Sequence, residues 1–566
     1  MSPISSRILI LGGYGTFGGR LAQLLAGDAR VTLLIGGRSF EQAQTFCDRL
    51  EPGASRSAVR FDRDGDLLAQ IRAANPDLVV DATGPFQCYG EDPYRLIKAC
   101  LVQGVDYLDL ADGSDFVKGV AQFDREARER RVFILSGVSS FPVLTAAVLR
   151  RLAHGLNTLD TIVGGIAPSP YAGVGMNVIR AIASYAGKRL ALIRGGHPSF
   201  GFAMTESLRY TISPPGRLPL RSVRFSLVDV PDLQVLPQRW PGLQSLWMGA
   251  GPVPEILLRM LNALAWLVRL RLLPSLLPFS LLIHHVSNRV RWGEHRGGMF
   301  VAVTGIDVGG TRVTRSWHLL AEGDDGPLIP SMACQAIIER RLAARRPAAG
   351  ARAATGDLEL EDYEALFARR TIYCGTRTSE PAAATQPLYQ RILGDAWDTL
   401  PAPLRAMHRC AGPQVAAGQA DVERGRNPLA RLVAFVLGFP SAGQQVPVQV
   451  VFTPDARGER WTRTFAGRSF TSFQSAGRGT SDHLLRERFG PLTFDLALVV
   501  EGANLRLVVR NWSLWGLKLP LFLAPGGDSY ETVIDDRFHF HVEIRHRLIG
   551  LIVRYRGWLE IRPRGA

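Results

Sequence analysis

Short apolar runs alternate with helix-like segments through the first 140 residues. The runs are ILIL at 8–11, VTLLI at 31–35, LVV at 78–80 and VFIL at 132–135. Runs without polar alternation are typical of strands buried on both faces of a parallel sheet. The helical segments between them provide the right-handed crossovers that such a sheet needs. We therefore predict an α/β fold with a Rossmann-type parallel sheet over residues 1–140.

The remaining pattern predicts two further domains. Residues 141–377 keep mixed helix and strand periodicity and are interpreted as a second α/β domain, for substrate binding or dimerisation. TSEPAAATQP, residues 378–387, is small and proline-containing, which is typical of a linker. Residues 388–566 contain many short alternating segments separated by turns, such as 455–458 and 501–504. We predict a mostly antiparallel, barrel-like C-terminal domain of α+β type, with helices at one end and an apolar cavity.

The most apolar stretch is residues 254–286. Three arginines and two prolines interrupt it, which argues against a membrane span of about 20 apolar residues. As a helix it has one narrow polar stripe on an otherwise apolar cylinder. Two interpretations remain open: peripheral contact with a membrane surface, or packing in a groove or homodimer interface. Either one is compatible with a hydrophobic small-molecule substrate.

A glycine cluster follows the first predicted strand directly. Gly13, Gly15 and Gly18 form G-x-G-x-x-G, and a predicted helix begins near Thr16. In dinucleotide-binding folds such glycines allow a tight turn, close approach of the pyrophosphate and close helix packing, and the helix N-terminus faces the phosphates. A structural strand-to-helix turn is the simpler alternative. The residues expected to hold the dinucleotide here are Gly12, Gly13, Tyr14, Gly15, Thr16, Phe17 and Gly18.

The second predicted strand favours NADP over NAD as the cofactor. It ends in GGRS, and Arg38 and Ser39 stand where NAD-binding proteins usually carry Asp or Glu for the ribose hydroxyls. A guanidinium binds a 2′-phosphate in a bidentate fork. Further along, Asp62 at a strand end is expected to contact the adenine. The turn after residues 78–81 passes close to the nicotinamide half of the cofactor, which adds Ala82, Thr83, Gly84 and Pro85.

The charge and the cysteine content argue against some classes of function. The net charge is +15, but the basic residues are almost all Arg and lie along the whole chain, with Lys only at 98, 118, 188 and 518. Without a basic block we expect no nucleic-acid partner. The six cysteines contain no C-x-x-C pair, which argues against a zinc cluster and for a reducing compartment. The expected location is cytoplasmic, peripheral at the inner membrane face if residues 254–286 bind lipid.

Longer motifs point to a known family. GPFQCYGEDPYRLIKACLVQGVDYLDLADG, residues 84–113, and GVSSFPVLTAAVLRRLA, from Gly137, resemble the saccharopine dehydrogenase-like NADP-binding oxidoreductases. The resemblance spans about residues 7–375, and it is closer to poorly characterised members and mycobacterial trans-acting enoyl reductases than to lysine-pathway enzymes. It implies a Rossmann domain and an inserted α/β domain whose sheet faces the nicotinamide. From about residue 386 the chain is similar to an uncharacterised bacterial domain fused behind such reductases.

No catalytic residue follows from the sequence or from the resemblance. Asp109, Asp112, Ser139 and Ser140 are expected at the carboxyl ends of strands, where they could orient a substrate or act as helix caps and turn residues. In RFHFHVEIRHR, His539 and His541 share a strand face, but Glu543 is too far along it to complete one coordination sphere. We therefore expect no metal site.

Two functional hypotheses remain. The first is an NADP-dependent oxidoreductase that exchanges hydride with a hydrophobic, lipid-like carbonyl or enoyl substrate. The second is a non-catalytic NADP-binding sensor or scaffold whose C-terminal domain binds a lipid or a partner. The missing general acid favours the second hypothesis, and the intact second domain favours the first.

Overall fold

The computed structural model describes residues 6–252, 254–379, 386–410 and 412–562. The chain forms two units. The first contains residues 1–208 and 224–373, and the second contains residues 209–223 and 374–566. Most of the expected linker at 378–387 lies outside the described residues.

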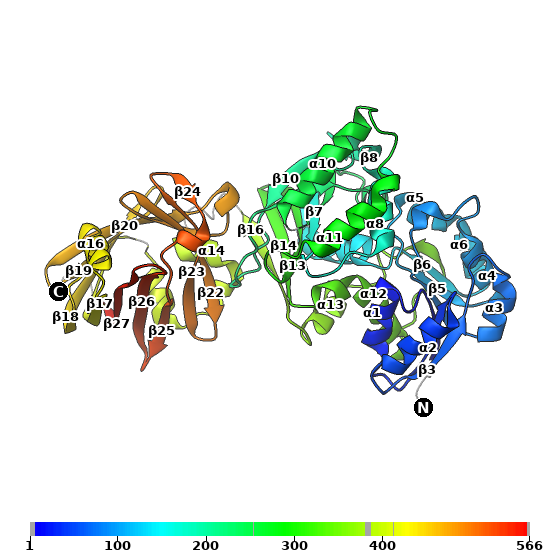
Figure 1. The fold of residues 1–566 in the computed structure, drawn as a ribbon, viewed down its shortest axis with the longest axis horizontal. Helices are drawn as coiled ribbons and strands as arrows, with labels where there is room; N and C mark the ends of the chain where they lie inside the picture. The colour runs from blue at the N-terminus through cyan, green and yellow to red at the C-terminus, as the bar shows by residue number, and fades with distance from the viewer. Residues whose placement is uncertain (1–5, 253, 380–385, 411, 563–566) are drawn as a thin grey trace. The chain divides into compact units, whose positions relative to one another are not determined.

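The first sheet is parallel throughout and has seven strands in the order β15-β6-β5-β4-β1-β2-β3 (Figure 1). The Rossmann prediction is confirmed, with a seventh strand, β15, that comes from far beyond residue 140. The strands are β1 (Ser6–Leu11), β2 (Val31–Gly37), β3 (Ser55–Arg60), β4 (Leu78–Asp81), β5 (Asp106–Asp109), β6 (Phe133–Ser136) and β15 (Gly350–Ala353). The associated helices are α1 (Thr16–Leu25), α2 (Phe40–Arg49), α3 (Leu67–Ala74), α4 (Arg95–Gln103), α5 (Ser114–Gly119), α6 (Asp124–Glu129) and α12 (Ile329–Leu342).

The apolar runs of these strands are buried for a simple reason. Helices cover both faces of the sheet, so the side chains on both faces of β1 and β4 are packed against other side chains. Ile8, Leu9 and Ile10 are wholly buried, as are Val79 and Val80. The carboxyl ends of β1, β4 and β5 therefore meet at one edge of a rigid sheet.

The second sheet of this unit is mixed. Its main path runs β10-β11-β12-β7-β13-β14-β16, and β8 and β9 branch from β12. The strands are β7 (Leu156–Ala167), β8 (Arg189–Arg194), β9 (His197–Phe202), β10 (Ser207–Tyr210), β11 (Val223–Leu227), β12 (Ser245–Ala250), β13 (Arg296–Asp307), β14 (Arg312–Glu322) and β16 (Ile372–Ser379). The helices are α7 (Thr145–Ala153), α8 (Met176–Tyr185), α9 (Asp232–Arg239), α10 (Glu255–Arg269), α11 (Ser280–Arg289) and α13 (Leu360–Phe367).

The apolar segment 254–286 forms most of α10 and α11, and its polar stripe is turned partly inward. Asn262 hydrogen-bonds with Ser226 Oγ (3.1 Å). The Arg269 guanidinium donates to Thr205 Oγ1 (3.2 Å) and lies 4.1 Å from the centre of the Phe202 ring. The outward face is consequently apolar. Its exposed side chains, together with those of the following turn and α11, are Ile256, Met260, Trp266, Leu267, Leu270, Leu272, Leu277, Phe279, Leu281 and Leu282.

Among the described helices, including α10 and α11, none combines the length and apolar character that a membrane crossing needs.

The second unit is built on one antiparallel sheet that closes on itself. Ten strands follow the order β22-β21-β20-β19-β18-β17-β27-β26-β25-β23, and pairing of β22 with β23 completes the barrel. The strands are β17 (Gln414–Arg424), β18 (Gly443–Asp455), β19 (Gly458–Phe465), β20 (Arg468–Ala476), β21 (Leu485–Phe489), β22 (Leu492–Glu501), β23 (Asn504–Leu514), β24 (Leu517–Leu519), β25 (Ser529–Ile534), β26 (Arg537–His546) and β27 (Gly550–Arg562). The helices are α14 (Leu388–Leu393), α15 (Ala402–His408) and α16 (Pro428–Val436). The barrel-like prediction is confirmed.

Both expected hairpin turns are present in the barrel. Asp455 pairs with Gly458 at the β18–β19 turn, and Glu501 pairs with Asn504 at the β22–β23 turn. Residues of β26 alternate between two faces, and one face is apolar: Phe538 belongs to the barrel core, and Phe540, Val542 and Ile544 pack against it.

Candidate functional site

The glycine cluster forms a cradle at the start of α1. Gly12 has a φ of +68°, which favours glycine. A Cβ on Gly18 would lie 2.3 Å from the Gly12 carbonyl oxygen, so the helix can approach the turn this closely only without a side chain. Gly15 is the N-cap of α1 and offers no side chain to cap it, and the first turn contains no acidic residue. The first N–H groups of α1 therefore remain available to an anion such as a pyrophosphate.

The expected 2′-phosphate contacts gather at the end of β2. The Tyr14 ring lies so close to Gly37 that a Cβ there would be 2.3 Å from a ring carbon. The Tyr14 hydroxyl accepts a hydrogen bond from the Ser39 N–H (3.2 Å), and Ser39 Oγ caps α2. Arg38, between Gly37 and Ser39, is exposed. Its guanidinium has no hydrogen-bond partner among the described residues, so it is free to bind an anion beside Tyr14.

Asp62 lies just beyond β3 and is held in a turn. Its backbone N–H donates to Gln70 Oε1 (2.6 Å), and its carboxylate accepts from the Asp64 N–H (3.1 Å). The Phe61 N–H donates to the Gly37 carbonyl (2.9 Å), which ties this turn to the end of β2.

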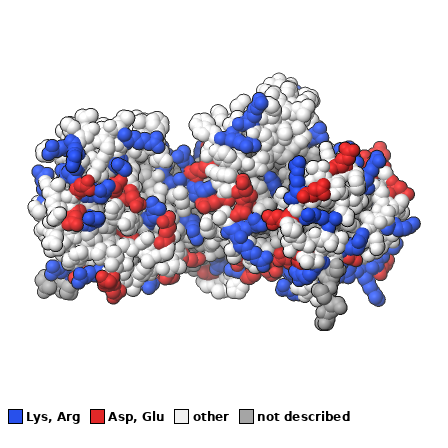
Figure 2. All heavy atoms as spheres, turned by 60° about the horizontal axis from the view of Figure 1, so that its bottom comes forward, with Lys and Arg blue, Asp and Glu red and all other residues white. Residues whose placement is uncertain are grey.

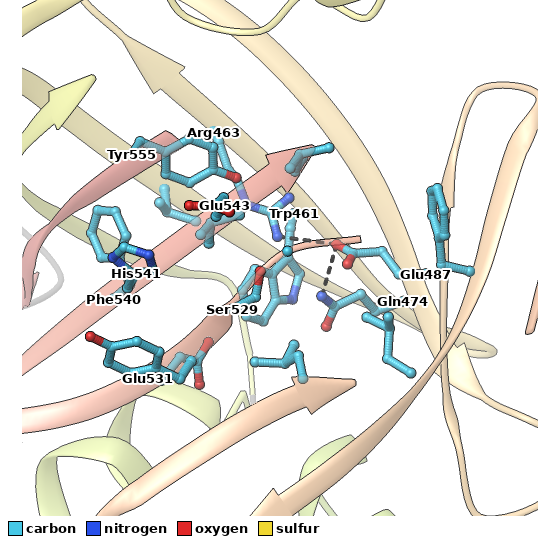
Figure 3. Close-up of a pocket in the computed structure, with 18 of the residues that line it drawn as sticks. Trp461, Arg463, Gln474, Glu487, Ser529, Glu531, Phe540, His541, Glu543 and Tyr555 are labelled. Carbon is cyan, nitrogen blue, oxygen red and sulfur yellow. Dashed lines mark hydrogen bonds and ion pairs between the residues drawn. The ribbon is translucent and has the colours of Figure 1, made fainter. Parts of the chain in front are cut away.

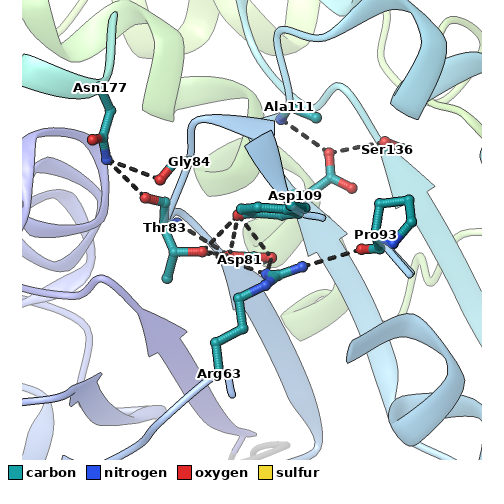
Figure 4. A network of polar contacts seen from close by, with 10 residues as sticks. Arg63, Asp81, Thr83, Gly84, Pro93, Asp109, Ala111, Ser136 and Asn177 are labelled. Atoms are coloured by element: carbon teal, nitrogen blue, oxygen red, sulfur yellow. Dashed lines mark hydrogen bonds and ion pairs between the residues drawn. The ribbon is translucent and has the colours of Figure 1, made fainter. Parts of the chain in front are cut away.

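A polar network that the sequence analysis missed lies at the end of β4 (Figure 4). The buried Asp81 carboxylate forms an ion pair with Arg63 and accepts from Thr83 Oγ1 (2.6 Å). The Tyr89 hydroxyl lies 2.6 Å from Thr83 Oγ1, and the Arg63 guanidinium lies 3.4 Å from the Tyr89 ring centre. Burial raises the pKa of Tyr89 above its usual value. Asp81 directly follows an apolar run. A charged residue at the end of a buried strand was the sequence feature that could have indicated this network.

The turn at residues 82–85 is shaped by this network and by contacts from both sides. A Cβ on Gly12 would lie 2.9 Å from the Ala82 carbonyl oxygen, so the turn lies against the glycine cradle. Asn177, at the start of α8, donates from Nδ2 to the carbonyls of Thr83 and Gly84 (both 2.9 Å; Figure 4). Pro85 continues into the short helix Phe86–Cys88. No motif in the sequence indicated a role for Asn177.

The segment before α8 also contacts the cradle. Arg20 on α1 donates to the Ala172 carbonyl (3.0 Å), and a Cβ on Gly175 would lie 2.8 Å from Thr16 Oγ1. On the other side of α1, the Phe17 carbonyl accepts from Ser331 Oγ of α12 (3.0 Å). Thr16 thus lies where the segment before α8 meets the glycine cradle, and Phe17 lies against α12.

Carboxyl groups cluster beyond the ends of β4 and β5. Asp112 accepts from Gln87 Nε2 (3.1 Å), and Asp229 accepts from Ser114 Oγ (2.5 Å). Burial raises the pKa of Asp229 to about 6, and it raises the pKa of Asp112 as well. Tyr185, at the end of α8, interacts electrostatically with both carboxylates, and burial raises its pKa well above the usual value. Asp229 can therefore exchange a proton near neutral pH.

The remaining catalytic candidates have structural surroundings. Asp109 is fully buried, and its Oδ1 accepts from the N–H groups of Gly137 (2.7 Å) and Ala111 (3.0 Å) and from Ser136 Oγ (2.9 Å; Figure 4). Burial raises the pKa of Asp109 to about 7. Ser139 precedes a short helical turn, and its N–H donates to the Gly137 carbonyl, while Ser140 is buried and accepts through its carbonyl from Thr145. Asp109 thus joins the end of β5 to the end of β6, and the two serines shape the turn that follows β6.

The β26 histidines do not form part of an acidic cluster. His541 stacks on Tyr530 with ring centres 5.1 Å apart, and Glu543 pairs with Arg554. Among the described residues, no group of three or more His, Cys, Asp and Glu side chains could hold a metal ion. On the face drawn in Figure 2, basic and acidic side chains are interspersed.

Comparisons with known proteins agree with the two-part structure. Residues 8–134 match the family model of the saccharopine dehydrogenase NADP binding domain, and residues 400–559 match a domain of unknown function (DUF4166). A comparison with curated proteins finds no match.

Two similar solved structures are saccharopine dehydrogenase (L-Glu forming) from Saccharomyces cerevisiae and a biliverdin reductase from Synechocystis crystallised with biliverdin and NADP+. The first is 13% identical with a TM-score of 0.48, covering 66% of this chain and all of its own. The second is 13% identical with a TM-score of 0.29, covering 64% of this chain and 95% of its own.

The family match coincides with the cradle, the parallel sheet and the polar edge described above. Residues 8–134 match the saccharopine dehydrogenase NADP-binding domain, and the chain joins this matched domain to a second one that matches a domain of unknown function.

Proposed function

We propose that the chain is an NADP-dependent oxidoreductase that exchanges hydride with a hydrophobic carbonyl or enoyl substrate. The observation that carries the proposal is the cradle formed by Gly12, Gly15 and Gly18 together with the unpaired Arg38 at its far end. The pyrophosphate would lie on the N–H groups of α1, and the 2′-phosphate between Arg38, Ser39 and Tyr14. The bound dinucleotide would supply the hydride.

The carboxyl cluster is the proposed source of the proton. Asp229 has a pKa of about 6, near the range in which a general acid or base works best. Ser114 connects it to α5, and Tyr185 and Asp112 interact with it electrostatically. A carbonyl placed beyond the ends of β4 and β5 would lie among these groups, at the edge where open α/β sheets bind ligands.

Fluorescence titration with NADPH and NADH tests the cofactor assignment. We expect the wild type to bind NADPH more tightly than NADH. Arg38→Ala should lower the affinity for NADPH by about 10- to 100-fold, because a charge-assisted bidentate contact is lost, and should leave the affinity for NADH unchanged. Arg49→Ala, an exposed arginine in the last turn of α2, is the matched control. Failure to bind either dinucleotide would assign the glycine turn a structural role only.

Turnover separates the enzyme from the sensor hypothesis. NADPH oxidation with lipid extracts as substrate source should proceed in the wild type. Tight NADPH binding without turnover on any extract would favour the non-catalytic alternative.

The exposed face of α10 and α11 is proposed to contact an anionic membrane surface. Its apolar side chains are accompanied by four exposed arginines, Arg259, Arg271, Arg289 and Arg291. Apolar area together with cationic charge is the combination that holds a helix in a bilayer interface. This contact would bring the proposed site to a hydrophobic substrate.

Vesicle cosedimentation tests this contact. Phosphatidylcholine vesicles containing phosphatidylglycerol should retain the wild type, and Leu281→Asp with Leu282→Asp should reduce retention by about tenfold or more. Leu548→Asp, an equally exposed leucine of the barrel unit, should have no effect. A change of oligomeric state in the double variant, with vesicle binding unaltered, would identify the face as a dimer interface instead.

A further inference from the structure

The C-terminal barrel encloses a cavity of about 180 Å³. Its walls are mainly apolar and aromatic, with Phe452, Phe465, Leu496 and Phe538 among them. Tyr389 of α14 and Met407 of α15 contribute to the lining, so the cavity reaches the barrel's helical end. Small-molecule sites combine such walls with a few placed polar groups.

One polar cluster is built into the barrel wall (Figure 3). Arg463 donates to Glu487 Oε1 (3.1 Å) and to Ser472 Oγ (2.8 Å). The same carboxylate oxygen accepts from Ser472 Oγ (2.7 Å) and from Gln474 Nε2 (3.0 Å). All four residues come from neighbouring strands β19, β20 and β21, so the cluster is rigid.

Two atoms beside this cluster lack a hydrogen-bond partner among the described residues. The hydrogen bonds of Glu487 with the described residues all use Oε1, which leaves Oε2 available as an acceptor. The hydroxyl of Tyr555, a cavity-lining side chain next to Arg463, has no partner either (Figure 3). Burial raises the pKa of Tyr555 to about 12, so the hydroxyl stays protonated and can donate.

The cavity continues toward an opening in the barrel wall. β23 pairs with β25 only through Leu505–Glu531 and Arg506–Tyr530, after which the two strands separate. A second hollow lies at this seam and includes the exposed Phe522. The residues that line both hollows are Leu507, Val509, Pro525, Gly526, Gly527 and Ser529.

The charges in the cavity favour an uncharged ligand. Arg463 is compensated by Glu487, Glu531 pairs with His408 (2.5 Å), and Glu543 pairs with Arg554 (2.6 Å). A carboxylate entering the cavity would therefore meet three acidic groups and no uncompensated cation, at the cost of its own desolvation. A hydroxyl or carbonyl avoids this cost and can accept from Tyr555.

We propose that the barrel binds an uncharged amphipathic lipid, a single alkyl or acyl chain that ends in a hydroxyl or carbonyl. The chain lies along the aromatic wall and enters through the β23–β25 seam. The terminal oxygen accepts a hydrogen bond from Tyr555, and a hydroxyl also donates to Glu487 Oε2. This site is separate from the dinucleotide cradle, so it holds even if the proposed redox activity is wrong.

Displacement of the neutral apolar dye phenylnaphthylamine from the full-length protein tests the site. Decanol should displace the dye. Tyr555→Phe should lower the affinity for decanol by about three- to tenfold, which is the usual contribution of one neutral hydrogen bond. Tyr363→Phe, which changes a buried tyrosine with an unpaired hydroxyl in the other unit, should leave decanol binding unchanged.

Two further variants test whether the ligand is uncharged and whether it lies in the cavity. Glu487→Gln leaves Arg463 uncompensated, so decanoate should gain at least about tenfold in affinity. Decanol should bind about three- to tenfold more weakly, because Oε2 no longer accepts a hydrogen bond from its hydroxyl. Val509→Trp fills the mouth and should abolish dye and decanol binding. The proposal is overturned if decanol does not displace the dye, if Tyr555→Phe binds decanol as the wild type does, or if binding survives Val509→Trp, which would place the lipid on another surface.

Discussion

The parallel sheet of the first unit and the barrel of the second place their polar groups in opposite ways. In the parallel sheet, polar side chains follow the ends of buried strands, so Thr83, Asp112 and the glycine cradle meet at one open edge. In the barrel, the polar groups Arg463, Glu487 and Tyr555 lie within strands and point into an enclosed space. In the parallel sheet, the functional residues can therefore be found in the sequence directly after each apolar run. In the barrel, no such position marks them.

This difference explains why one candidate site follows from sequence and the other does not. A glycine turn is local, since its residues are separated by only a few positions. The barrel cluster joins residues from positions 463 to 555, and only closure of β22 on β23 encloses them. Substitutions in either region test whether the two sites are independent.

The largest expected effect is at the cradle. Gly18→Val places a side chain where even a Cβ would be 2.3 Å from the Gly12 carbonyl, so NADPH affinity should fall by at least about 100-fold. Decanol binding by the barrel should be unchanged. Gly27→Ala, whose Cβ would meet nothing within 4 Å, is the control. A parallel loss of decanol binding would show that the two sites are coupled.

The second effect is on turnover. Asp229→Asn removes the proposed proton donor but keeps its shape, so kcat should fall by about 100-fold or more with the NADPH dissociation constant unchanged. Steady-state kinetics with an accepted substrate and a fluorescence titration give the two quantities. Asp48→Asn, an exposed aspartate on α2, should retain activity. Unchanged kcat in Asp229→Asn would move the donor role to Tyr185 or Asp112.

The third effect should be confined to barrel stability. His408 is fully buried, with Nε2 2.5 Å from Glu531 Oε2 and Nδ1 without a partner among the described residues. Glu531→Ala leaves buried His408 Nε2 without its hydrogen-bond partner, which typically costs about 1–3 kcal/mol. Calorimetry should show a lower unfolding temperature for a transition that NADPH does not shift. An equal decrease in the unfolding temperature of the NADPH-sensitive transition would contradict this prediction.

The smallest effect, taken per pH unit, is a pH dependence of the stability of the first unit. Asp109 has a folded pKa of about 7, above the unfolded value near 4, so the folded state binds the extra proton and stability falls as pH rises through 7. Between about pH 5 and pH 8 the loss is roughly 3 kcal/mol. Asp109→Asn mimics the protonated acid and should flatten this dependence in thermal unfolding. An equal slope in wild type and variant would assign the dependence to other groups.

Much of the first unit was predictable because its determinants are local. Apolar runs indicated β1, β2, β4 and β6, and the glycine spacing indicated the cradle. The partners Arg63 and Asn177 escaped prediction because each contacts the turn at residues 83–84 or its network from a distant element, and a lone arginine in an arginine-rich chain gives no signal. The strand β15 was missed for the same reason, since it joins β6 from more than 200 residues away.

The sequence by itself determined the strand and helix types, the glycine turn, the hairpins and the apolar face of β26, because each depends on residues a few positions apart. Tertiary structure alone decided which polar groups are enclosed together. Closing a ten-strand barrel buries Arg463, Glu487 and Tyr555 in one apolar space, and packing of α10 through Asn262 and Arg269 leaves its apolar face outward. Burial is a property of the assembled fold, and it sets the pKa values and unpaired donors on which both proposed sites depend.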